Sequence, residues 1–125
     1  MAMQDDFMIN NIRDAVRLVT KLLFGEKKMP DYQIGQDNAT EESDRLFREI
    51  KSKAAEGKIN EAEDQLLTQM EPENIAYLEL ALTFYLGLND LDTDFLEDHD
   101  YSREEILDGV KSLAEDWGIS GLEYF

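Results

Sequence analysis

Cysteine is absent from this chain of 125 residues, and histidine and proline are scarce. Without a thiol, the protein can form neither disulfide bonds nor zinc–thiolate sites, and it has no cysteine nucleophile. His99 is the only histidine, so no second imidazole is present to share a metal ion with it. Two prolines and seven glycines interrupt the chain at few places, which leaves room for long helices.

Long hydrophobic runs are missing as well. Apolar runs such as Leu22-Leu23-Phe24 fall far short of the about 20 residues that a membrane-spanning helix needs. The start of the chain, MAMQDDF, is acidic where a secretory signal peptide is basic. We therefore expect a cytoplasmic protein, and the lack of cysteine fits that expectation.

Positive charge is rare in the second half of the chain. The net charge is −17, and it divides into −1 for residues 1–60 and −16 for residues 61–125. Nucleic-acid binding needs a cationic surface that displaces counterions, so we expect no nucleic-acid partner. Apolar residues nevertheless make up 42% of the chain, which supports a hydrophobic core and argues against a disordered acidic tail.

The spacing of the apolar residues predicts an all-α protein. No segment of useful length alternates apolar and polar residues with a period of two. We predict one domain over residues 1–125, a small helical bundle of about five helices. It consists of an amphipathic helix at 1–25, a linker at 26–40 and a bundle at 41–125. Pro30 and Gly35 mark the linker, and Met29, Tyr32 and Ile34 are expected to pin it to the surface.

Local sequence signals place the helix ends. Gly25 is expected to stop the first helix, and Thr40 to act as N-cap of a helix at about 41–55. Asn60 and Glu63 have the spacing of a capping box for the next helix.

Two further helices are expected toward the C-terminus. Residues 74–88 are apolar on nearly all sides, which is typical of a buried central helix. The last helix, at about 103–117, has Ser102 and Glu105 as its capping box. The apolar tail residues that follow are expected to dock on the bundle: Leu122, Tyr124 and Phe125.

The first helix is the best candidate for a functional surface. Its apolar residues recur at spacings of three and four, so they share one face. The candidate interaction face consists of Met8, Ile12, Val16, Val19 and Leu23, widened by Phe7, Leu18 and Leu22. A candidate basic face on the other side consists of Arg13, Arg17 and Lys21.

Either the chain's own bundle or a second chain would bury this apolar face. We expect a protein partner, in a homo-oligomer formed through the first helix. The basic face also permits binding to a membrane surface, although the acidic remainder of the chain opposes an anionic one. Peripheral membrane association is therefore the alternative.

The stretch DLDTDFLEDHDYSREE, residues 90–105, resembles a calcium loop only in part. Asp90, Asp92 and Asp94 match the first three ligand positions of such a loop. Phe95 stands where the turn needs glycine, and Tyr101 stands where a bidentate Glu must close the site. We therefore predict no metal site.

Signals for helix N-termini account for more residues of this stretch than a calcium loop does. Asp94 and Glu97 have capping-box spacing for a short helical turn, and Tyr101 with Ile106 forms a hydrophobic staple for the last helix. His99 is expected to be an exposed loop histidine, because no Ser or Cys accompanies it at catalytic spacing.

No other pattern indicates catalysis. The sequence has no glycine-rich phosphate loop, and its many acidic pairs are expected on solvated helix faces. We expect no catalytic residue, no cofactor and no enzymatic activity.

GKINEAEDQLL, residues 57–67, resembles the second half of a tetratricopeptide repeat, in which Gly57, Ile59, Ala62 and Leu66 occupy the recurring positions. Glu49 and Lys53 depart from the apolar pattern of the first helix of such a unit. The resemblance implies a helical hairpin within a small bundle. It covers about thirty residues and one unit, whereas three or more units build a peptide-binding groove.

The whole chain also resembles a family of small, acidic, uncharacterised bacterial proteins. The shared pattern comprises QDD at Gln4–Asp6, EGKINEAEDQL at Glu56–Leu66, YLELAL at Tyr77–Leu82 and SREEI at Ser102–Ile106. This resemblance implies a common helical fold and no activity. The most economical expectation is a non-enzymatic interaction or scaffold module.

Overall fold

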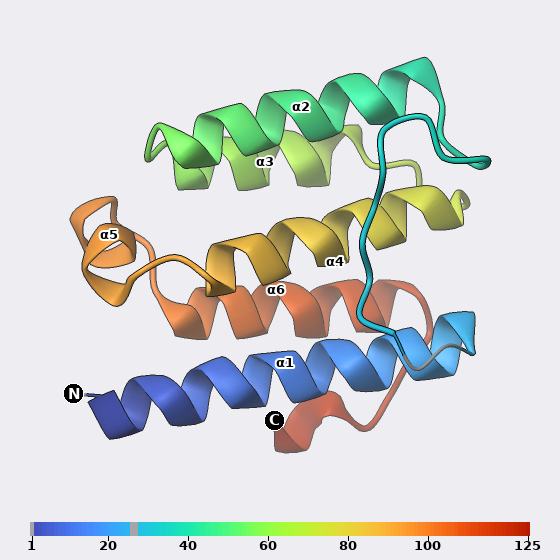
Figure 1. Cartoon of the computed structure of the whole chain (residues 1–125). Helices are drawn as coiled ribbons and strands as arrows, with labels where there is room; N and C mark the ends of the chain where they lie inside the picture. The colour runs from blue at the N-terminus through green and yellow to red at the C-terminus, as the bar shows by residue number, and fades with distance from the viewer. Residues whose placement is uncertain (1, 26–27) are drawn as a thin grey trace.

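Six α-helices pack into a bundle, and the described part of the chain contains no strand (Figure 1). The computed structural model describes residues 2–25 and 28–125. Its elements are α1 (Ala2–Phe24), α2 (Glu41–Ala55), α3 (Ile59–Gln69), α4 (Ile75–Asn89), α5 (Thr93–Asp98), α6 (Arg103–Asp116) and a 3-10 turn, η1 (Leu122–Tyr124). The prediction of an all-α bundle is confirmed. Six helices replace the expected five or so because residues 93–98 form a short helix of their own.

The central element is α4, as its apolar sequence predicted. It packs against α2 on one side and against α1 and α6 on the other, while α3 pairs with α2 and α5 closes one end (Figure 1). Tyr77, Leu80 and Tyr85 are among its buried residues, which lie on several sides of the helix. Because α4 contacts both layers, buried residues of α1 to α4 and α6 join in a single hydrophobic core.

The structure confirms the predicted helix ends that depend on residues close in the sequence. Gly25 follows α1 with φ +69°, a left-handed conformation that glycine adopts without strain. The side chain of Thr40 accepts a hydrogen bond from the amide of Ser43 at the start of α2. Ser102 and Glu105 form the predicted capping box at the start of α6.

Two predicted capping boxes are wrong. Helix α3 begins at Ile59 without a side-chain cap, because Asn60 donates instead to the carbonyl oxygen of Asp100 at 3.1 Å. Its intended partner Glu63 accepts a 2.6 Å hydrogen bond from the hydroxyl of Tyr85. At α5 the N-cap is Asp92 rather than Asp94, so the spacing to Glu97 no longer fits a capping box.

The linker crosses from α1 to α2 past the face of α4 (Figure 1). Its described part, residues 28–40, contains no helix, as predicted. Tyr32 is buried and Met29 partly buried, whereas Ile34 is 43% exposed and does not pin the linker. At the C-terminus, Leu122 is buried and Phe125 packs against the core, while the side chain of Tyr124 lies outside the described residues.

Candidate functional site

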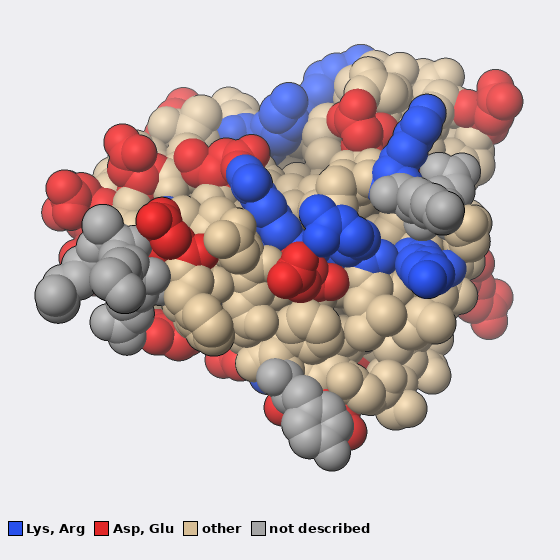
Figure 2. Space-filling view, turned by 60° about the horizontal axis from the view of Figure 1, so that its bottom comes forward, with Lys and Arg blue, Asp and Glu red and all other residues tan. Residues whose placement is uncertain are grey.

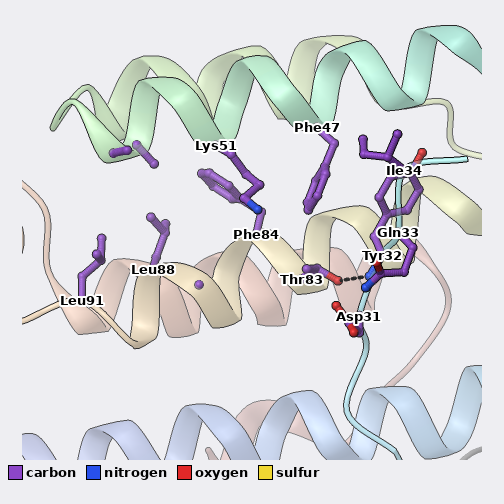
Figure 3. Close-up of a pocket in the computed structure, with 13 residues that line it drawn as sticks. Asp31, Tyr32, Gln33, Ile34, Phe47, Lys51, Thr83, Phe84, Leu88 and Leu91 are labelled. Carbon is purple, nitrogen blue, oxygen red and sulfur yellow. Dashed lines mark hydrogen bonds between the residues drawn. The ribbon is translucent and has the colours of Figure 1, made fainter.

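A groove of about 490 Å³ opens between α2, α4 and the linker (Figure 3). Phe47 of α2 and Phe84 and Leu88 of α4 give it apolar walls. Its lining residues are Asp31, Tyr32, Gln33, Ile34, Phe47, Lys51, Ala54, Ala55, Thr83, Phe84, Gly87, Leu88 and Leu91. A volume of this size falls within the range of ligand and side-chain binding pockets.

Small residues on both walls keep the groove open. Ala54 and Ala55 lie on α2, and Gly87 lies on α4. A Cβ atom added at Gly87 would have no heavy atom within 4 Å apart from its chain neighbours and the backbone of its own helix. Glycine in a helix interior costs about 0.5–1 kcal/mol relative to alanine, so the open space exists at some expense to the helix.

Tyr32 of the linker fills one end of the groove. Its ring lies 4.9 Å from that of Phe47, centroid to centroid, with the ring planes tilted by 58°. Its backbone amide donates to Oγ1 of Thr83 at 2.9 Å (Figure 3). Neighbouring linker residues are tied down too, since the amide of Gly35 donates to Asp44 and the side chain of Gln36 donates to Glu79. The linker is therefore a fixed wall of the groove.

Polar contacts also hold the Tyr32 side chain. Its hydroxyl donates to Oδ1 of Asp44 at 2.6 Å and lies 2.7 Å from Oγ of Ser43. Burial of the phenol, together with its hydrogen bond to the Asp44 carboxylate, raises the pKa of Tyr32 to about 12. At neutral pH the hydroxyl stays protonated and keeps donating to Asp44.

One cation and one carboxylate stand at the rim. The ammonium of Lys51 lies 5.1 Å from the centroid of the Phe47 ring, within cation–π range, and Asp31 belongs to the linker wall. Thr83 already donates to the carbonyl of Glu79 and accepts from Tyr32. The apolar walls of the groove are suited to holding an apolar group. Lys51 at the mouth of the groove is available to pair with a carboxylate beside that group.

The predicted interaction face of α1 lies mostly inside the molecule. Ile12, Val16 and Val19 are fully buried, while Met8 and Leu23 are partly buried and pack against the same core. They face inward where α1 packs on α6 and α4. Two residues expected to widen this face do not belong to it. Phe7 is 67% exposed and Leu22 is 57% exposed, because both lie beyond the edge of the buried stripe.

The predicted basic face of α1 is exposed. Arg13 pairs with Asp90 at 3.0 Å and Arg17 with Asp14 at 2.8 Å, and Lys21 is exposed as well. Lys and Arg side chains gather on the side of the molecule shown in Figure 2, beside an area of uncharged surface. Both ion pairs are solvated, so each contributes at most about 1 kcal/mol to stability.

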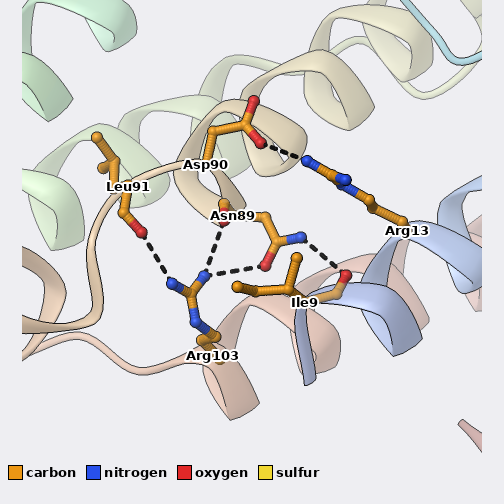
Figure 4. Close-up of polar contacts among 6 residues, drawn as sticks. All are labelled: Ile9, Arg13, Asn89, Asp90, Leu91 and Arg103. Carbon is orange, nitrogen blue, oxygen red and sulfur yellow. Dashed lines mark hydrogen bonds and ion pairs between the residues drawn. The ribbon is translucent and has the colours of Figure 1, made fainter. Parts of the chain in front are cut away.

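A buried arginine joins α6 to the end of α4, and sequence patterns did not single it out. Arg103 is 8% exposed and donates to the carbonyl oxygens of Asn89 and Leu91, each at 2.8 Å (Figure 4). These carbonyls lie at the negative end of the α4 dipole, where a cation is favourable. Asn89 in turn donates to the carbonyl of Ile9 in α1. The cluster links three helices.

The acidic stretch is divided between separate local roles. Asp90 pairs with Arg13, and Asp92 precedes α5 as its N-cap. His99 is half-buried rather than exposed, because its ring packs on Phe95 with centroids 4.4 Å apart. Its Nδ1 lies 2.7 Å from the carbonyl oxygen of Phe95. Among the described side chains, no three or more His, Asp or Glu converge on a point that could hold a metal ion.

Comparison with protein families matches residues 2–118 to a family of unknown function, DUF6483. The chain belongs to this family. The match confirms the resemblance to a family of uncharacterised proteins, and the DUF6483 region includes all six α-helices and every residue that lines the groove. No curated protein and no solved structure matches the chain. No described helix combines the length and apolarity needed to cross a bilayer.

Proposed function

We propose that this DUF6483 chain is a non-enzymatic protein-interaction module whose docking site is the groove between α2 and α4. The observation that carries the proposal is that the chain's own Tyr32 fills one end of the groove while the other end, around Gly87, is open. The occupant of the open end is an apolar side chain of a partner protein, with a nearby carboxylate that faces Lys51.

The energy of such a contact sets its role. Burying one large apolar side chain contributes about 1.5–3 kcal/mol, whereas a micromolar complex needs about 8 kcal/mol. The groove therefore acts as an anchor point within a larger interface. The surrounding contacts would exclude water and add specificity, as they do around other anchor side chains.

The tetratricopeptide-like character of the α2–α3 pair is part of this proposal. Gly57 makes the turn with φ +87°, and Ile59, Ala62 and Leu66 are fully buried. Glu49 and Lys53, which depart from the apolar pattern of the repeat, form a row of polar contacts between the two helices. Gln65 donates to Glu49 at 3.4 Å and accepts from Lys53 at 2.6 Å. The proposal therefore concerns one hairpin beside α4, without a groove made of repeated units.

Site-specific photo-cross-linking from the rim tests this function. A photoreactive residue at Ala55, which is exposed and lines the groove, is compared in the native cell with one at Ser112, which is exposed on α6. We expect a discrete protein adduct from Ala55 only. The identified partner, once purified, should bind the protein, and Gly87→Leu should weaken that complex by at least about tenfold. Identical adducts from both positions, or a complex insensitive to Gly87→Leu, would contradict the proposal.

A second candidate function is peripheral membrane association through α1. It is favoured by the exposure of Phe7 and Leu22 on the helix that also carries Arg17 and Lys21. Co-sedimentation with vesicles that contain anionic lipid tests it at low salt, where attraction between exposed charges is strongest. Binding should fall when Lys21 and Leu22 are replaced by Glu and Ser. Wild-type protein that stays entirely in the supernatant would reject this candidate.

A further inference from the structure

Phe7 is an aromatic side chain that the molecule leaves in solvent. At 67% it has the largest exposed fraction among the exposed large apolar side chains of the described residues, which are Phe7, Leu22, Ile34 and Leu67. It projects from α1, and the carboxylate of Asp6 beside it is exposed too. An aromatic ring next to a carboxylate is the combination that the open end of the groove is suited to hold.

The groove offers a matching surface. Its open end is bounded by the ring of Phe84, the side chain of Leu88 and the bare backbone at Gly87. Aromatic rings in such surroundings gain from edge and offset contacts beyond the burial of their area. Lys51 at the rim supplies the positive charge that would meet Asp6.

The charge distribution permits a second copy at this site. Two molecules of net charge −17 repel each other, yet residues 61–125 carry −16 of that charge. Phe7, Asp6 and Lys51 belong to residues 1–60, whose net charge is −1, whereas the α4 residues at the open end belong to residues 61–125. Asp31 and Lys51 are the charged residues among those that line the groove, so the lining itself carries no net charge. The groove lining therefore adds no net charge to the repulsion between two copies.

We propose that the occupant of the groove is Phe7 of a second copy of this chain, with Asp6 of that copy facing Lys51. This inference rests on the proposed function, because it uses the same docking site. Contacts across a two-fold axis are reciprocal, so each copy would place its Phe7 in the groove of the other, which closes the assembly at a dimer. The outward Phe7, rather than the buried face around Val16, then mediates assembly.

Sedimentation equilibrium of the full chain tests self-association, and substitutions are the informative changes. Deletion of α1 would remove Ile12 and Val16 from the core, whereas Phe7→Ala alters an exposed residue. We expect a concentration-dependent dimer in the range of about 1 µM to 1 mM, and an affinity at least about tenfold lower for Phe7→Ala. Gly87→Leu should weaken the dimer equally by filling the groove. Leu67→Ala, at an exposed apolar position on α3, is the matched control and should leave it unchanged.

Mixing the two variants identifies the partner directly. Phe7→Ala retains an open groove and Gly87→Leu retains Phe7, so an equimolar mixture can form one of the two reciprocal contacts. The mixture should associate more tightly than either variant alone. Charge reversal gives an independent test. Asp6→Lys and Lys51→Glu should each weaken the dimer, and the double variant should recover at least part of the affinity.

The outcomes separate this inference from the proposed function. A wild-type protein that remains monomeric near 1 mM, where association worth about 4 kcal/mol is detectable, would overturn the second-copy proposal. So would an oligomer insensitive to both Phe7→Ala and Gly87→Leu. In either case an Ala55 adduct with a different protein, sensitive to Gly87→Leu, would leave the groove's role as a docking site intact.

Discussion

The imidazole ring of His99 lies directly against the backbone of Gly57. A Cβ atom at Gly57 would come within 2.2 Å of Cδ2 of His99, so only glycine allows this contact. Gly57 forms the turn between α2 and α3, and His99 follows α5. The single histidine of the chain therefore docks α5 onto a turn far away in the sequence.

This contact predicts that the cost of Gly57→Ala depends on His99. In the wild-type background the alanine has two costs. One is a left-handed conformation at φ +87°, about 1–2 kcal/mol, and the other is displacement of the imidazole ring. In the His99→Ala background only the first cost should remain. Urea unfolding of the wild type, both single variants and the double variant measures the difference. Equal losses in the two backgrounds would show that the ring does not press on the turn.

Gly109 and Gly87 should respond in opposite directions to alanine. A Cβ atom at Gly109 would lie 2.5 Å from Cζ of Tyr85, whose hydroxyl is fixed by Glu63. Overpacking costs about 1–3 kcal/mol and should exceed the gain in helix propensity, so Gly109→Ala destabilises the protein. Gly87→Ala meets no atom and should stabilise it by about 0.5–1 kcal/mol. Thermal or urea unfolding distinguishes the two, and a stabilising Gly109→Ala would be inconsistent with the close packing of Tyr85.

Arg103 should be far more sensitive to substitution than Arg13. Lysine at position 103 retains the charge but cannot reach the carbonyls of Asn89 and Leu91 with a planar fork. We expect Arg103→Lys to lower the free energy of unfolding by about 1–3 kcal/mol, since buried acceptors lose their donors. Arg13→Lys, at an exposed ion pair, should change it by less than about 0.5 kcal/mol. Similar effects of the two substitutions would mean that the buried contacts of Arg103 contribute little to the free energy of unfolding.

Alkaline pH should destabilise the protein through its buried tyrosines. Burial raises the pKa of Tyr32 to about 12 from an ordinary value of 10, and it also raises the pKa values of Tyr77, Tyr85 and Tyr101. Below pH 10 the Tyr32 contribution is fully present, because the folded and unfolded states are both protonated. Between about pH 10 and 12 the unfolded chain releases the proton and the folded state retains it, so stability falls.

The Tyr32→Phe variant isolates one part of that loss. Its free energy of unfolding should fall less steeply between about pH 10 and pH 12 than that of the wild type, because one titrating phenol is gone. Urea titrations at several pH values, with tyrosinate absorbance as a second signal, measure the slopes. Identical slopes for the two proteins would assign the alkaline transition to the other tyrosines.

Features that arise within a few residues could be predicted from the sequence. Thr40, Ser102 and Glu105 act on amides three residues away, so the local pattern is sufficient. The apolar character of residues 74–88 similarly indicated a central helix. Asn60 was misassigned because its side chain reaches Asp100, a partner brought close only by folding.

The groove was not predictable for the same reason. It depends on the relative placement of α2, α4 and the linker, and its most informative residue, Gly87, is marked in the sequence only by the absence of a side chain. Arg103 was missed because arginine is usually a surface residue. The misjudged width of the α1 apolar face has a simpler cause. Helical spacing identifies the apolar stripe of α1, but it does not show where the neighbouring helices stop covering that stripe. Phe7 lies beyond the covered part.

The packing of α1 against α6 joins the first helix of the chain to the last. During synthesis, Val16 and Val19 leave the ribosome long before residues 103–116 exist to cover them. At about 5–20 residues per second, the apolar face of α1 stays without its α6 partner for several seconds. During this time the newly made chain exposes apolar surface of its first helix, and repulsion between the abundant carboxylates of the segments that follow opposes association of such chains.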